Sequence, residues 1–167
     1  EITDFAPRFY SRSRYFRPMT LVRRVRPIQG SPRIRVALKV RYDWGQTTPE
    51  ITRGSNHIRY VGESMTLRLS TDAPVSHVLS GQAFVLTREH NFLLGADETL
   101  VDGIADTARH FEQETTAYWR SWSRALAIPL EWQDAVIRAA ITLKLSLYEE
   151  TGAIVAAMTT SIPESAH

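Results

Sequence analysis

The chain has 167 residues, of which 43% are hydrophobic and 23% charged, so it can bury a sizeable core and is not a disordered segment. It contains no cysteine, which excludes disulfide bonds and thiolate metal sites, and no apolar run approaches the roughly 18 residues that span a bilayer. We therefore expect a cytoplasmic protein without membrane contact. Because the first residue is Glu1, we also expect the natural amino terminus, with any export signal, to lie upstream.

Charge is distributed unevenly along the chain. Residues 1–70 carry 14 bases against five acids, a balance of +9, whereas residues 71–167 carry six bases against 13 acids, a balance of −7. Clustered arginines are typical of nucleic-acid binding, because they neutralise phosphates. Here the bases alternate with apolar residues, which indicates the solvated face of a sheet. We expect no nucleic-acid partner.

Short alternating runs separated by turn residues fill the first hundred residues. They predict strands at Met19–Ile28, Arg33–Tyr42, His57–Val61, Met65–Ser70 and Gln82–Leu94. No helical pattern intervenes between them, so the pattern indicates an antiparallel β-sandwich over residues 1–101 and not parallel βαβ units. In the second run, Ile34, Val36, Leu38 and Val40 should face the core, and Arg33, Arg35, Lys39 and Arg41 should face solvent.

The pattern becomes helical after residue 100. Apolar residues recur every three or four positions from Ile104 to Leu126, which predicts an amphipathic helix within residues 102–128. Pro129 fits the first turn of a second helix over about residues 130–148, and Gly152 fits a stop after it. That second helix is apolar on all sides, so it requires helical neighbours that the chain does not contain.

Three sequence motifs resemble, in order and spacing, those of glycoside hydrolase family 15, which includes glucoamylases, glucodextranases and some bacterial trehalases. The motifs are Ile2–Pro7 with Tyr15–Pro18 and Arg41–Gly45, then Thr116–Trp122, then Gly152–Ala157 with Thr159–Glu164. The resemblance implies an N-terminal β-sandwich, a linker helix, and the first helix and entry loop of an (α/α)6 barrel at residues 129–167. Met158 departs from the pattern, and the chain ends before the motif that shapes the sugar pocket. The resemblance therefore implies a fragment of a larger protein.

The resemblance also implies the chemistry. Family 15 enzymes are inverting, exo-acting hydrolases of α-linked glucosides such as oligosaccharides, dextran or trehalose, and they use two glutamates. Both glutamates match positions beyond this chain, so we expect no catalytic residue here and no activity from the isolated chain. Thr159, Thr160, Ser161 and Glu164 are the candidates for nearness to substrate, either binding sugar hydroxyls or supporting the loop.

Other candidate sites are weak. Glu149 and Glu150 are neighbours whose side chains point apart in a helix, and the five histidines show no metal-ligand spacing, so we expect neither a metal nor a cofactor. Trp44 lies in a turn and could contact carbohydrate. A second class of function stays open, namely a non-catalytic β-sandwich module that binds carbohydrate or a partner protein.

Overall fold

The structure, a computed structural model, describes residues 1–156. The chain forms two compact units, Glu1–Tyr118 and Trp119–His167. The candidate substrate-proximal residues Thr159, Thr160, Ser161 and Glu164 lie outside the described residues.

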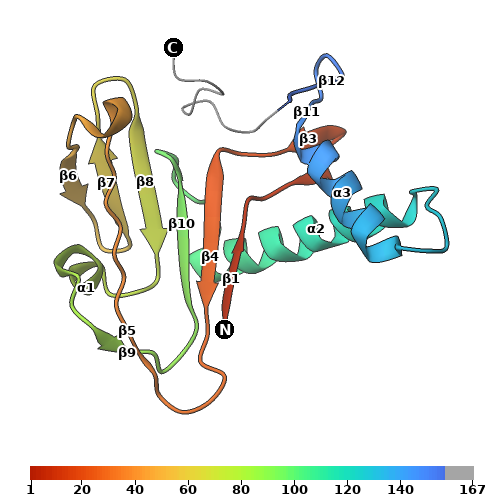
Figure 1. Ribbon diagram of the computed structural model, residues 1–167. Coiled ribbons are helices and arrows are strands. Elements are labelled where there is room, and N and C mark those ends of the chain that lie inside the picture. The colour runs from red at the N-terminus through yellow and green to blue at the C-terminus, as the bar shows by residue number, and fades with distance from the viewer. Residues whose placement is uncertain (157–167) are drawn as a thin grey trace. The chain divides into compact units, whose positions relative to one another are not determined.

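A six-stranded antiparallel sheet dominates the first unit (Figure 1). Its spatial order is β1-β4-β10-β8-β7-β6, and every neighbouring pair is antiparallel. The strands are β1 (Ile2–Phe5), β4 (Thr20–Val25), β6 (Glu50–Arg53), β7 (His57–Val61), β8 (Thr66–Thr71) and β10 (His90–Ala96). The prediction of a β-rich, antiparallel first region is confirmed.

One face of this sheet carries the larger hydrophobic core. Side chains alternate along each strand, so Leu69 of β8 and Ile58 of β7 point to the same face as Phe92 of β10. The partly buried side chains of Ile34, Val36 and Leu38 pack against this core from an extended segment that follows β5 (Arg33–Ile34).

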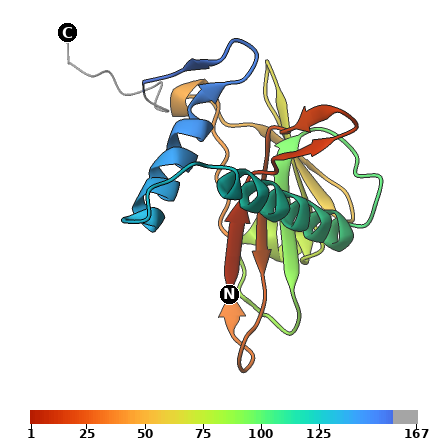
Figure 2. The ribbon, with the colours of Figure 1, turned by 90° about the vertical axis from the view of Figure 1, so that its right-hand side faces the viewer.

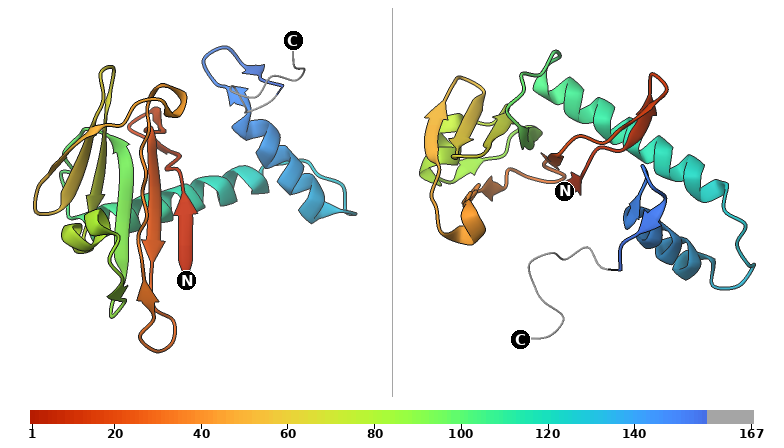
Figure 3. Two further views of the ribbon diagram at one scale, coloured as in Figure 1. Left: turned by 60° about the vertical axis from the view of Figure 1, so that its left-hand side comes forward. Right: turned by 90° about the horizontal axis from the view of Figure 1, so that it is seen from above.

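A smaller core lies on the opposite face. Val22 of β4 and Leu93 of β10 pack there against Ala108 of helix α2 (Ile104–Arg124), together with Phe5 and Phe111. Figure 2 shows the first part of α2 running across the sheet. The extended segment and this part of α2 therefore cover opposite faces, as the views in Figure 3 show. The predicted amphipathic helix is confirmed as α2, and Ile104, Ala108 and Phe111 of its first part pack in the smaller core.

The predicted strand Arg33–Tyr42 is corrected by the structure. Only Arg33 and Ile34 form a ladder, with β9 (Phe84–Val85), and Tyr42 makes an isolated bridge to Thr47. The expected alternation of side chains is nevertheless confirmed: Ile34, Val36, Leu38 and Val40 are half-buried or buried, and Arg33, Arg35, Lys39 and Arg41 are exposed. The segment has the side-chain pattern of a strand without a neighbouring strand to pair with.

Several short elements were missed in the sequence. Strands β2 (Phe9–Ser11) and β3 (Arg14–Phe16) form a hairpin whose turn residues Arg12 and Ser13 have positive φ. A short helix, α1 (Val75–Ser80), separates β8 from β9, contrary to the expectation of uninterrupted strands. It ends at Gly81 in the left-handed conformation that glycine accepts without strain, and all strand pairings remain antiparallel.

The second unit contains the end of α2, helix α3 (Gln133–Leu145) and a small hairpin of β11 (Leu147–Tyr148) and β12 (Ala153–Ile154). Two predicted boundaries are wrong. The helix begins three residues later than expected, because Trp132 adopts a left-handed conformation at its N-cap, so Pro129 lies in the preceding loop. Gly152, with φ of 76°, shapes the turn of the hairpin and does not stop the helix.

Candidate functional site

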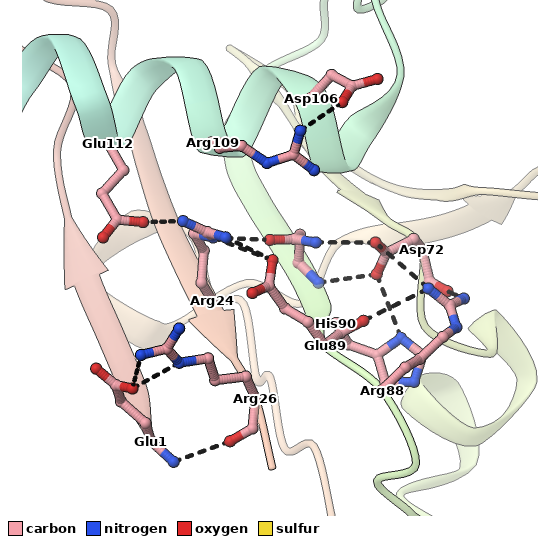
Figure 4. Close-up of polar contacts among 11 residues, drawn as sticks. Glu1, Arg24, Arg26, Asp72, Arg88, Glu89, His90, Asp106, Arg109 and Glu112 are labelled. Atoms are coloured by element: carbon pink, nitrogen blue, oxygen red, sulfur yellow. Dashed lines mark hydrogen bonds and ion pairs between the residues drawn. The ribbon is translucent and has the colours of Figure 1, made fainter. Parts of the chain in front are cut away.

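A polar network joins three elements of the first unit, and Figure 4 shows its side chains. Arg24 of β4 lies at its centre. The guanidinium donates to Glu89 Oε1 from Nη2 at 2.7 Å and to Asn91 Oδ1 from Nε at 3.3 Å. It also forms an ion pair with Glu112 of α2 through Nη1. One cation therefore holds two carboxylates that lie 23 residues apart in the chain.

A third carboxylate, Asp72, extends the network beyond β10. Asp72 Oδ1 accepts from the main-chain N–H of Asn91 at 2.8 Å, and Oδ2 accepts from the Asn91 amide at 2.9 Å. Nδ1 of the buried His90 lies 3.3 Å from Asp72 Oδ1, and Arg88 donates to the Asp72 main-chain carbonyl. The buried polar side chain of Asn91 thus bridges the two halves of the network.

The electrostatics of this network favour charged, paired groups. Burial of the guanidinium opposes its charge, but the hydrogen bonds to Glu89 and Glu112 outweigh that effect and raise the pKa of Arg24 above its ordinary value. A general acid must instead release a proton to substrate from a carboxyl group that is not committed to a cation. The network is therefore suited to tying α2 to the sheet and not to acid–base catalysis.

His77 and His110 serve as packing groups. His77 lies 5.7 Å from Phe84 between ring centroids, and His110 meets Phe9 edge-on at 5.8 Å. Asp72 contacts His90 and not His77, so the nearby Ser76, His77 and Asp72 do not form a triad. Among residues 1–156, no three His, Asp or Glu side chains gather closely enough to hold a metal ion.

Glu149 and Glu150 lie in the turn between β11 and β12, which corrects the expectation that they end a helix. Lys144 Nζ lies 2.9 Å from Glu149 Oε1 in an ion pair. Since this carboxylate is already paired with a cation, it does not form a catalytic pair with its neighbour.

Trp44 is the one tryptophan of the first unit, and its indole is 79% exposed. The residue and its predecessor Asp43 both have positive φ, at 54° and 48°, in a one-turn 3-10 helix. Tyr42 braces the turn, because its hydroxyl donates to the Tyr60 carbonyl at 2.7 Å and accepts from the Leu67 N–H at 3.2 Å. The turn therefore presents an aromatic surface on a fixed support, as the sequence had indicated.

An apolar groove of about 410 Å³ lies on the larger-core face of the sheet. One wall is the extended segment from Ile34 to Leu38, and the floor comes from β1, β4, β8 and β10. Ile2 and Leu21, both exposed, line it beside Arg23, which is ion-paired with Asp4 at 2.6 Å. No sequence pattern had indicated this groove, because it forms between segments that are distant in the chain.

Comparison with known proteins finds two similar sequences. A trehalase from Thermoplasma volcanium is 27% identical over 142 residues, which cover 79% of this chain and 22% of that protein. A trehalase from Thermoplasma acidophilum is 45% identical over 53 residues, which cover 32% of this chain and 9% of that protein. The chain thus spans about a fifth of the length of the first relative. No family model matches the sequence, and no solved structure matches the fold.

These similarities place the chain in a distant relationship with trehalases. No helix among residues 1–156 has the length and apolar character needed to cross a membrane.

Proposed function

We propose that these residues belong to a larger, inverting glycoside hydrolase of the family 15 type, acting on α-linked glucosides. The observation that carries the proposal is the similarity to a trehalase over 79% of the chain. Trehalose is accordingly the first substrate to test, with maltooligosaccharides and dextran after it.

The proposal assigns each part of the chain to a domain of that larger protein. In this proposal, residues 1–101 form the N-terminal sandwich, residues 102–128 the linker helix, and residues 129–167 the start of an (α/α)6 barrel. The catalytic glutamates lie outside the chain, and Thr159, Thr160, Ser161 and Glu164 lie near the substrate. Support comes from α3, none of whose residues is buried within the described part of the chain, as expected of a barrel helix without its neighbours.

The carboxylates of the described residues give further support. Glu89 and Glu112 are bound to one arginine, and Glu149 is ion-paired with Lys144. Inverting hydrolysis needs a protonated carboxyl group and a carboxylate roughly 6.5–9.5 Å apart, with a water between substrate and base. None of these paired groups meets that need.

The anomeric form of the first product tests the proposal. An inverting enzyme acting on trehalose turns the attacked glucose into the β-anomer, while the leaving glucose keeps its α configuration. Proton NMR at early times, on a longer polypeptide that extends beyond residue 167, should show equal amounts of α- and β-glucose. Initial α-glucose alone would indicate retention and would contradict the family assignment. Hydrolysis by residues 1–167 alone would show that the catalytic pair lies inside the chain.

A further inference from the structure

Residues 35–41 form an extended segment without the main-chain pairing of a strand. Within the described chain, none of their N–H or C=O groups takes part in a main-chain hydrogen bond. Among residues 1–156, the one other hydrogen bond to this backbone is local, from the Arg41 guanidinium to the Val40 carbonyl at 3.1 Å. Main-chain polar groups of folded proteins are nearly always satisfied, and an unpaired strand edge accepts another strand readily.

The groove next to this segment has the shape and lining that an added strand requires. Val36 and Leu38 form its wall, while Leu21 and Leu94 belong to its floor. A strand that paired with residues 35–41 would place every second side chain in the groove, because successive side chains point to opposite faces. Those inward side chains must be apolar to cover the exposed Ile2 and Leu21.

The outward side chains of the segment are basic, and they determine which charge an added strand must carry. Arg33, Arg35 and Lys39 are exposed and have no acidic partner among residues 1–156. Opposite charges on directly facing positions of two strands stabilise the pair, and like charges destabilise it. The matching strand therefore alternates apolar residues with acidic ones.

A second copy of this chain is a poor occupant for the same reason. An antiparallel pair of these segments centred on Ala37 would oppose Arg33 to Arg41 and Arg35 to Lys39. Every charged outward position would then face a like charge.

We propose that residues 35–41 receive a β-strand of alternating apolar and acidic residues from the remainder of the same, longer polypeptide. This rests on the proposed function in one respect, that the chain is part of a larger protein. The similar trehalase has most of its length outside the matched region, so it has ample chain to supply a strand. A covalently linked strand also meets the edge at a millimolar effective concentration, which favours it over a separate partner.

Hydrogen exchange of the main-chain amides tests this inference directly. Amides 35–41 should all exchange rapidly in residues 1–167. In a longer polypeptide every second one of them, the set whose N–H groups face the added strand, should exchange at least ~100-fold more slowly, because pairing removes their access to water. The amides of β10, which lies inside the sheet, report in the same experiment that the first unit is folded. Equally rapid exchange of 35–41 in the longer polypeptide, with β10 protected, would overturn the inference.

Charge reversal distinguishes the predicted occupant from others. In the longer polypeptide, Arg35→Glu should restore rapid exchange at 35–41, whereas Arg53→Glu, an exposed base on β6, should leave it slow. Protection that survives Arg35→Glu would exclude an acidic strand. Protection in residues 1–167 together with a dimer mass would show that a second copy fills the groove. Since exchange does not depend on hydrolysis, an inactive longer polypeptide with protected amides would contradict only the proposed function.

Discussion

Arg24 shows how one residue secures a helix to a sheet. The side chain is only 17% exposed, and it balances Glu89 of the loop before β10 and Glu112 of α2. Arg26, two residues further along β4, forms a comparable pair with Glu1 but is 56% exposed. A partly buried cation with two partners should contribute more to the free energy of unfolding than an exposed ion pair, which typically adds under 1 kcal/mol.

We therefore expect Arg24→Met to lower the free energy of unfolding by about 2–4 kcal/mol, because it leaves two carboxylates facing each other without a cation. Arg26→Met should cost less than about 1 kcal/mol. Urea denaturation at pH 7 measures both. Equal effects of the two substitutions would mean that the network around Arg24 adds nothing beyond a surface pair.

Ile58 and Ile51 offer the same comparison for apolar packing. Ile58 of β7 is fully buried in the larger core, whereas Ile51 of the edge strand β6 is 51% exposed. Ile58→Ala should destabilise the protein by about 2–5 kcal/mol through lost burial and a residual cavity. Ile51→Ala should cost clearly less in the same thermal or urea measurement, and similar losses would mean that the burial of Ile58 adds nothing beyond the contribution of an exposed isoleucine.

His57 should make stability depend on pH in a predictable direction. Burial, with the nearby charges of Arg68 and Arg59, lowers the pKa of His57 below its ordinary value of 6.5. Between the folded and unfolded pKa values the unfolded state binds more protons, so the free energy of unfolding falls as pH drops below about 6.5. NMR titration should give a midpoint below 6.5, and His57→Gln should flatten the decline between pH 7 and 5. A midpoint at or above 6.5 would contradict this.

The sequence pattern predicted those elements whose structure depends on a single segment, and it failed for segments whose structure depends on pairing with another strand. Strands β7 and β8 and helix α2 follow their sequence patterns closely, because each presents one regular apolar face. The run Arg33–Arg41 has an equally regular pattern and the predicted burial, yet only two residues enter a ladder. A ladder requires a neighbour, and no pattern within a strand reveals whether the described chain supplies one.

Short elements escaped prediction for a different reason. The strands of the β2–β3 hairpin have three residues each, too few to show a period, and α1 spans less than two turns. The Arg24 network was equally invisible, since Glu89 and Glu112 are distant in sequence and carry no local signature. The substrate-proximal candidates at residues 159–164 remain predictions.

At the scale of the molecule, the uneven charge of the chain is partly resolved within its first unit. Bases from the first seventy residues pair with acids from later ones: Arg24 with Glu89 and Glu112, and Arg59 with Asp97 at 2.5 Å. Arg33, Arg35 and Lys39 of the extended segment have no such partner among residues 1–156, and neither have Arg12, Arg14 and Arg53. The unpaired bases of the first unit therefore lie partly beside the groove and partly elsewhere on its surface.

The apolar surface of α3 should make residues 1–167 associate with themselves. Leu143 and Leu145 are 57% and 46% exposed, and Leu130 and Trp132 are exposed just before the helix. Exposed apolar patches of this kind drive association, so the sedimentation coefficient of residues 1–167 should rise with protein concentration. Leu143→Gln with Leu145→Gln should reduce that rise, because it removes exposed apolar area from two sides of the helix without touching a buried residue. The control substitution Val101→Gln replaces an exposed apolar residue of the first unit and should leave the rise unchanged. A chain that stays monomeric at every concentration would show that α3 needs no neighbour and would remove the support it gives to a missing barrel.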